Sequence, residues 1–507
     1  MSIGIVHILG IVLTLSLIIG VGIYSGTKVK KGSDFSSGGG KAGPWIVCGT
    51  IMGALVGGQA TIGTAQLGFM CGLSAWWFTL GSGIGCAIMA WGYVKPMRQS
   101  GSTTLMEVVS KEYGQPAEYV GSILSSIGIF ISIIAQVVSA CALITTLFDI
   151  NPWIAIGISV VIMIIYVIFG GVWGAGMGGV VKLILLYGVS IVGLVIVLIY
   201  TKGVSGLFDL LNGTMLQTTI GDLYGTATSM EANSQFYSLV SRGVSKDIGS
   251  GISLIIGVLS TQTYASAIWA AKSDSAARKG ALFSACLIPP IGIACIAIGI
   301  FMRGHAITAD EVNQLVEMGK AVPDGLIRLE TTAQVFPAFV VNYMPEFIGG
   351  MALATLLITI IGGGAGLSLG AAVIVVEDII CKVNHRIADN DNSRLAITRC
   401  MIVLILIAAA IVAGMDTGTV INDMGFLSMG LRGSVVFIPF TAALFMPGRI
   451  DAKAGLASIF AGPAVLIICN IIGVPLDPMF FGVGANIICV AAGYIINRRK
   501  TDVRLRS

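Results

Sequence analysis

The sequence predicts an all-α membrane protein with about thirteen transmembrane helices. Three observations predict it: 55% of the 507 residues are hydrophobic, only 11% are charged, and long apolar stretches recur along the whole chain. Soluble domains carry roughly 25% charged residues, so the composition excludes an ordinary soluble protein. Most of the ten cysteines fall inside apolar stretches without metal-site spacing, so we interpret them as small buried hydrophobes.

The expected helices are the apolar stretches long enough to cross a bilayer, which takes about 20 residues. They cover 4–24, 45–67, 75–93, 118–147, 151–169, 178–200, 248–269, 280–302, 346–376, 397–414, 424–446, 454–473 and 478–497. A short amphipathic helix is expected at 103–112, and the longest connectors are 201–247 and 303–345. The first stretch has no cationic flank and no cleavage site, so we expect a retained helix rather than a signal peptide.

The lysines and arginines predict the orientation, because cytoplasmic connectors are enriched in both residues. With the N-terminus outside and the C-terminus inside, only six of the 29 fall on the outer side: Lys202, Arg242, Lys246, Arg303, Lys320 and Arg328. Lys182 and Arg432 lie inside apolar stretches, and the others occupy inner connectors or the C-terminal tail. We therefore expect a multi-pass protein of the cell membrane, N-terminus outside and C-terminus cytoplasmic.

The second apolar stretch contains an interruption. Gly53, Gly57, Gly58 and Gly63 fall near its middle, and Gln59 adds a polar group at the same depth. Glycine costs a helix interior about 1 kcal/mol relative to alanine, and hydrocarbon penalises unpaired backbone groups. A break here therefore indicates a protein-walled cavity or a ligand site. The alternative is a glycine-rich face for close helix packing.

Two other stretches carry comparable signals. Gly362, Gly363 and Gly364 are consecutive in the ninth stretch, where we expect a second break, since paired interruptions in two halves of a transporter mark a midplane site. In the seventh stretch, six of the seven residues 260–266 are polar, Gln262 among them, which favours a cavity wall over hydroxyls bonded back to their own helix.

Lys182 and Arg432 are functional candidates because a charge near the bilayer centre costs at least ~2.5–3.5 kcal/mol. The alternatives are that the Lys182 stem carries its ammonium to the interface and that Arg432 only bonds backbone carbonyls. Because no acidic residue lies near mid-membrane, we expect the solute to bring the negative charge. A carboxylate suits the planar fork of Arg432.

Nothing in the sequence indicates an enzyme. His7, His305 and His385 are far apart and form no metal set, and no phosphate-binding loop occurs in its strand–turn–helix context. We therefore expect no cofactor and no nucleic-acid partner. The expected partners are the lipid bilayer and a small-molecule solute, and the oligomeric state is left open.

Five motifs carry a family resemblance: DFSSGGGKAGPW (34–45), LGFMCGLSAWW (67–77), TTLMEVVSKEYG (103–114), WAAKSDSAARKG (269–280) and the EDII that ends the ninth stretch. With them the chain resembles the sodium:solute symporter family, which includes sodium–proline, sodium–galactose and sialic acid symporters. The resemblance implies a LeuT-type fold in a single transporter domain over 1–507. Helices two to six (45–200) and seven to eleven (248–446) would form two inverted repeats, with solute between the broken second and seventh helices.

The same resemblance implies a sodium site, which this sequence alters. Its backbone carbonyls fall at Gly53, Val56 and Thr359, and its two hydroxyls fall at Gly362 and Gly363. Glycine has no hydroxyl, so two of the five oxygens are absent, and a hard cation with fewer oxygen ligands binds more weakly.

Lys182 is the second departure from the family. Gly178, Gly179 and Lys182 stand where members usually carry Thr-Asp and then Gln, so an acidic neighbour of the sodium site is replaced and a lysine has appeared. We hypothesise that the Lys182 ammonium occupies the cation site. A desolvated lysine can lose its proton, so the coupling ion, sodium or proton, is left open.

We therefore expect a secondary transporter of a small anionic solute, independent of sodium if Lys182 fills the site. The candidate substrate contacts are Gly57, Gly58, Gln59, Gln136, Gln262 and Arg432. Gln136 stands alone in the fourth stretch and could equally be an interhelical hydrogen bond. The alternatives are an ordinary sodium symporter that recruits Ser368 or water, and a non-transporting ligand sensor.

Overall fold

The computed structural model describes residues 4–26, 40–148, 150–211, 236–317, 324–383, 390–415 and 420–504, with 319, 321, 322 and 387. This part of the chain is almost entirely helical, which confirms the predicted fold class. The first six residues of the 34–45 motif lie outside it, as do Lys28, Lys30 and Lys31.

The helices of the first half are α1 (Ile5–Gly26), α3 (Pro44–Leu55), η2 (Gln59–Gly63), α4 (Thr64–Cys71), η3 (Gly72–Trp76), α5 (Trp77–Ile88), η4 (Met89–Tyr93), α6 (Val94–Gln99), α7 (Leu105–Tyr113), α8 (Gln115–Phe148), α9 (Pro152–Tyr200) and α10 (Val204–Asp209). The second half contains α13 (Val244–Leu259), α14 (Gln262–Trp269), α15 (Asp274–Arg303), β1 (Ala306–Thr308), α16 (Ala309–Glu317), β2 (Ile327–Leu329), η5 (Thr332–Gln334), α17 (Val335–Tyr343), α18 (Glu346–Val373), η6 (Ile374–Ile380), α19 (Cys381–Val383), α21 (Asp391–Met415), α22 (Ile421–Phe445), α23 (Ala452–Ile472) and α24 (Pro478–Arg504).

Nine helices among the described residues are long and apolar enough to cross a membrane, or ten if the bent pair α13–α14 is one span. Shorter apolar helices occur at Ile5–Leu17, Pro44–Leu55 and Pro152–Ile168, where three more spans were expected. The count of thirteen therefore stays a prediction.

The helical element α9 contains two arms that fold back on each other. An added Cβ on Gly178 would lie 2.5 Å from the Tyr166 hydroxyl. In a straight helix those residues would be about 18 Å apart along the axis. The arms therefore correspond to the separate fifth and sixth helices that the hydropathy pattern predicts.

Two of the three predicted helix breaks are present. The second helix stops at Leu55 and resumes at Gln59, and the seventh stops at Leu259 and resumes at Gln262 with a bend of 43°. The break expected at Gly362–Gly364 was wrong, because α18 runs through these glycines without interruption. Helices pack closely around α18 on every side, and a continuous helix keeps its backbone hydrogen bonds inside the membrane.

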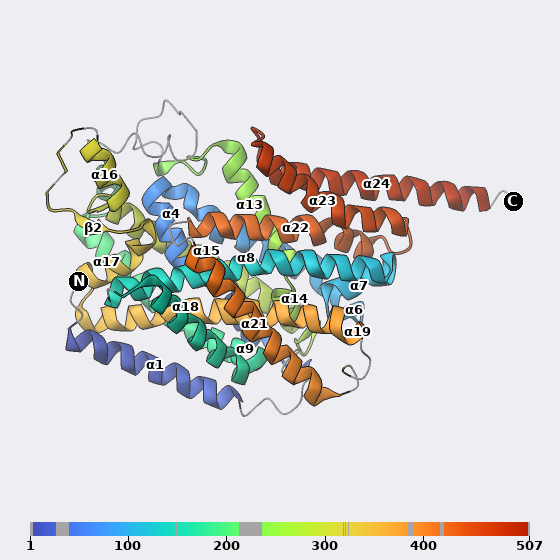
Figure 1. The fold of residues 1–507 in the computed structure, drawn as a ribbon, viewed down its shortest axis with the longest axis horizontal. Helices are drawn as coiled ribbons and strands as arrows, with labels where there is room; N and C mark the ends of the chain where they lie inside the picture. The colour runs from blue at the N-terminus through green and yellow to red at the C-terminus, as the bar shows by residue number, and fades with distance from the viewer. Residues whose placement is uncertain are drawn as a thin grey trace.

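The breaks lie among long helices that pass through the middle of the molecule (Figure 1). There α8 and α22 pack against each other, α18 packs against α8 and α9, and α1 packs on α18 at one edge. At the opposite edge α23 and α24 pair with each other. The connector 303–345 is not a plain loop: β1 and β2 pair in parallel within it, followed by α17.

Candidate functional site

The break in the second helix depends on two glycines that face α8. An added Cβ on Gly57 would lie 2.5 Å from Gln136 Oε1, and one on Gly58 would lie 3.2 Å from the same atom. Any side chain at these positions would push α8 away from the break. Instead the Gly58 N–H donates to Gln136 Oε1 at 2.6 Å, so a side chain of α8 satisfies backbone that the broken helix leaves unpaired.

Lys182 extends from α9 into the cation site that the family resemblance implies. Its ammonium donates to three carbonyl oxygens: Gly53 at 2.6 Å, Val56 at 2.9 Å and Thr359 at 3.3 Å. The residue is only 3% exposed. This arrangement differs from the alternative in which the Lys182 stem carries its ammonium to the membrane interface. In the described part of the chain Lys182 makes no ion pair. The ammonium therefore joins the C-terminal end of α3, where the break begins, to the middle of α18.

The two glycines at the hydroxyl positions lie on different sides of this centre. An added Cβ on Gly362 would be 3.5 Å from Lys182 Nζ and 3.9 Å from the Gly53 carbonyl oxygen, which places this position at the ammonium. One on Gly363 would instead lie 3.1 Å from both Gln136 Oε1 and Gly57 Cα. Gly363 thus allows α18 to approach the break closely, and only Gly362 borders Lys182.

A chain of amides leads from the break to Gln59. Gln136 Nε2 donates to Gln59 Oε1 over a long 3.4 Å, and Gln59 Nε2 finds no hydrogen-bond partner among the described residues. Gln59 is 3% exposed. Four of the predicted substrate contacts therefore meet at one place: Gly57, Gly58, Gln59 and Gln136. The Gln59 Nε2 donor is left there without a partner among the described residues.

Sequence reasoning missed Asn422, which faces the same region from α22. Asn422 Nδ2 donates to Thr64 Oγ1 at 3.4 Å, while its Oδ1 has no partner in the described structure. An added Cβ on Gly425, one turn later on α22, would lie 3.0 Å from Gln59 Nε2. Little in the sequence points to Asn422, because it stands at the start of an apolar stretch beside Asp423 and looks like part of a connector.

Gln262 lies away from this amide group. Its Oε1 accepts from the Leu105 N–H at 2.9 Å, and its Nε2 donates to the Thr103 carbonyl and the Ser266 hydroxyl, both at 3.0 Å. The amide is thus saturated, and it holds α14 to the segment before α7.

Arg432 lies between the break in the seventh helix and α8. Its guanidinium donates to hydroxyl groups of Thr261 at 2.8 Å, Ser132 at 3.0 Å and Ser428 at 2.9 Å, and to the Ser428 carbonyl at 3.1 Å. The side chain is fully buried and makes no ion pair among the described residues. These hydroxyls come from the break in the seventh helix, from α8 and from α22 itself. Arg432 therefore does more than bond backbone carbonyls, which was the alternative.

A cavity of about 870 Å³ lies at the Asp423 end of α22, and we call it the Arg242 cavity. Arg242 pairs with the buried Asp247 at 2.7 Å and with Asp423 at 3.2 Å, and its guanidinium lies 5.0 Å from the centre of the Phe426 ring. Phe426 lines the cavity and packs on Phe78 at 5.7 Å between ring centres.

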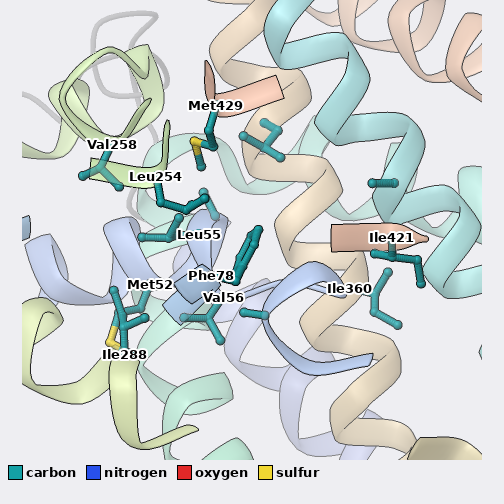
Figure 2. Packing of buried hydrophobic residues seen from close by; sticks show 14 of the residues in the cluster. Met52, Leu55, Val56, Phe78, Leu254, Val258, Ile288, Ile360, Ile421 and Met429 are labelled. Carbon is teal, nitrogen blue, oxygen red and sulfur yellow. The ribbon is translucent and has the colours of Figure 1, made fainter. Parts of the chain in front are cut away.

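Phe78 separates the Arg242 cavity from the amide group. Its Cε2 would lie 2.6 Å from an added Cβ on Gly425, beside Gln59. Phe78, Val56, Leu254 and Met429 belong to one buried apolar cluster (Figure 2). The amides and Lys182 are therefore enclosed by apolar side chains, and the two rings lie between them and the cavity.

Comparisons with known proteins identify a family and a fold. The model of the sodium:solute symporter family matches residues 35–462. A monocarboxylic acid transporter of Corynebacterium glutamicum is 23% identical over 495 residues, covering 91% of this chain and 83% of that protein.

Two solved structures share the fold. A substrate-bound, outward-open sodium-coupled sialic acid symporter superposes with a TM-score of 0.75 at 17% identity, covering 98% of both chains. A nucleobase-cation-symport-1 family transporter, closed around bromovinylhydantoin, gives a TM-score of 0.52 at 11% identity, over 92% of this chain and 94% of that one. The likeness to these two structures shows that the chain has the LeuT-type fold. The chain belongs to the sodium:solute symporter family.

Proposed function

We propose that this secondary transporter moves a small carboxylate solute and does so without sodium, because the Lys182 ammonium occupies the cation site. One observation carries the proposal: Lys182 Nζ donates to the carbonyls of Gly53, Val56 and Thr359. These are the three backbone oxygens that the family resemblance assigns to sodium. A fixed positive charge among them opposes the entry of a second cation.

The missing hydroxyls support the same proposal. At Gly362, beside the ammonium, the chain offers no side-chain oxygen, so a sodium ion would find a poor ligand set even if Lys182 moved away. Proton transfer to and from the lysine would then replace sodium as the coupling step. Proton-driven uptake or plain exchange of solutes would follow.

Three features support a carboxylate as the solute. Lys182 and Arg432 are buried cations without an ion pair in the described structure, so the site lacks a balancing negative charge. The relative in C. glutamicum is named for monocarboxylic acids. The orphan Gln59 amide supplies a donor for one carboxylate oxygen.

Uptake by the purified protein in liposomes tests the proposal, with radiolabelled carboxylates and with sodium and proton gradients imposed separately. Uptake that ignores sodium and follows a proton gradient, or that appears only as exchange, is the expected result. Strict sodium dependence would overturn the lysine argument and indicate an ordinary symporter of the family. If the protein binds carboxylates without flux, it is a sensor.

A further inference from the structure

Two buried amides in the site each have one polar atom without a partner among the described residues. Gln59 Nε2 is a donor and Asn422 Oδ1 is an acceptor. Both side chains are almost completely buried. Buried polar atoms are nearly always hydrogen-bonded in native proteins, so a donor and an acceptor left over in one region indicate a ligand with the complementary pair.

The orientation of the Gln59 amide is fixed by its neighbours. Gln136 must present its oxygen to the Gly58 N–H, since a backbone N–H can only donate. Its nitrogen therefore faces Gln59 and must find an oxygen there. Gln59 Nε2 is therefore the atom without a partner among the described residues. If the Gln59 amide were rotated by half a turn, its nitrogen would face the Gln136 nitrogen, and both are donors.

The orientation of the Asn422 amide is fixed in the same way. The Thr64 hydroxyl donates to the backbone carbonyl of Gln59 at 3.1 Å, so its hydrogen is used and its oxygen can only accept. The group of Asn422 that faces Thr64 is therefore the nitrogen. Asn422 Oδ1 is therefore left without a partner among the described residues. Thr64 is the positioning residue that fixes this orientation of the Asn422 amide.

The two atoms lie on facing turns of η2 and α22, because Asn422 Oδ1 lies against Gly63 and Gln59 Nε2 lies against Gly425. Gln59 lies against Gly425, and Asn422 precedes Gly425 by three residues on the same face of α22. That is roughly 5 Å along the helix axis, and each hydrogen bond adds about 2.9 Å of reach. An oxygen acceptor and a hydroxyl donor on neighbouring carbon atoms fit this spacing.

We propose that Gln59 and Asn422 select a carboxylate that carries a hydroxyl on the adjacent carbon. Gln59 Nε2 donates to a carboxylate oxygen, and the 2-hydroxyl donates to Asn422 Oδ1. A 2-oxo acid would present an acceptor to Asn422 Oδ1 and is disfavoured. Because Lys182 and Arg432 make the surroundings cationic, a neutral hydroxyl fits better than an ammonium donor. This inference rests on the proposed carboxylate transport.

The test is uptake by full-length protein in liposomes of three probes with the same carbon skeleton: 2-hydroxypropanoate, 2-oxopropanoate and propanoate. Wild-type protein should prefer the hydroxy acid over the other two by roughly tenfold or more. Asn422→Ala should bring the hydroxy acid to within about twofold of propanoate, and the readout is this ratio of the two uptake rates measured on the same variant. Thr64→Val is nearly isosteric and frees the Asn422 amide to turn over, so it should raise uptake of the oxo acid relative to the hydroxy acid.

Asn486→Ala is the matched control. Asn486 is also a fully buried asparagine, but its Oδ1 accepts from Ser458 and its Nδ2 donates to the Ser434 carbonyl, so both ends are satisfied. This variant should keep the wild-type order of the three probes, which separates specificity from general effects of cutting a buried asparagine.

The outcomes distinguish the inference from the function on which it rests. Uptake of propanoate with no preference for the hydroxy acid, or a preference that survives both Asn422→Ala and Thr64→Val, would overturn the selection while carboxylate transport stands. If wild-type protein takes up none of the three probes but carries a solute without a carboxyl group, both proposals are wrong.

Discussion

Replacing Lys182 by alanine should lower sodium-independent transport at least tenfold. The change removes three hydrogen bonds from an ammonium to backbone carbonyls, two of them shorter than 3 Å. It leaves three oxygens from α3 and α18 directed at the vacated space. Lys182 lies on α9 and links α3 to α18. Its loss therefore weakens the contact among these three helices during the transport cycle.

The size of the effect follows from two opposing contributions. Hydrogen bonds from a charged group contribute about 1.5–3 kcal/mol each, so the two short ones give about 3–6 kcal/mol. Removing the lysine also removes the desolvation cost of its buried charge, on the order of several kcal/mol. Net stability should therefore change little. Transport should fall at least tenfold, since losing about 1.4 kcal/mol in one state of the cycle shifts its population tenfold.

The assay is initial-rate uptake of a labelled carboxylate into liposomes, with sodium or choline outside and with or without a proton gradient. A matched control is Lys111→Ala, because Lys111 Nζ also donates to a carbonyl, that of Ser100 at 2.8 Å, but lies on α7 with its side chain 48% exposed. A second variant, Lys182→Ala with Gly362→Ser, adds a hydroxyl where an added Cβ has room at 3.5 Å. It should show sodium-stimulated uptake.

The reasoning would be refuted if Lys182→Ala transported at the wild-type rate with the same response to the proton gradient. It would also be refuted if wild-type uptake required sodium, because the ammonium could not then fill the cation site throughout the cycle.

The remaining predictions concern packing and buried charge. Gly362→Ala should be tolerated in a thermal-unfolding assay, whereas Gly363→Ala should lower the melting temperature by several degrees, since its Cβ would press on a neighbouring helix at 3.1 Å. Arg432→Lys should lower uptake more than tenfold at normal expression, because an ammonium cannot reproduce a fork bonded to three hydroxyls. Arg242→Met should cost about 3–5 kcal/mol and reduce the yield of folded protein, because it leaves a fully buried carboxylate unpaired. Asp423→Asn changes a partly exposed ion pair, so it should lower the stability by under about 1 kcal/mol. The yield of folded protein should therefore stay close to that of the wild type.

Hydropathy and residue type were sufficient to predict most of the fold. Apolar length predicted the helices, and glycine with polar neighbours predicted the break at Gly57, because both signals are local. The family resemblance implied the break in the seventh helix. The expected break at Gly362 was wrong for a reason that is not local. Consecutive glycines lower helix propensity, but the helices around α18 favour a continuous, tightly packed helix.

Matching motifs to a family predicts Lys182 and its three carbonyls from the sequence alone. Spacing along the chain could not do the same for Asn422 or show that Gln262 is saturated elsewhere, since each depends on which helix lies opposite. The roles of these residues in substrate binding and coupling stay predictions until transport is measured.

The sequence by itself determined that this is a many-helix membrane protein with buried cations and a broken second helix, because hydrophobic length, glycine content and the cost of buried charge act residue by residue. Only the tertiary structure decided which polar atoms are satisfied. A hydrogen bond needs two groups within about 3 Å, and here the partners are separated by up to hundreds of residues in the chain, as in the bond from Asn422 to Thr64.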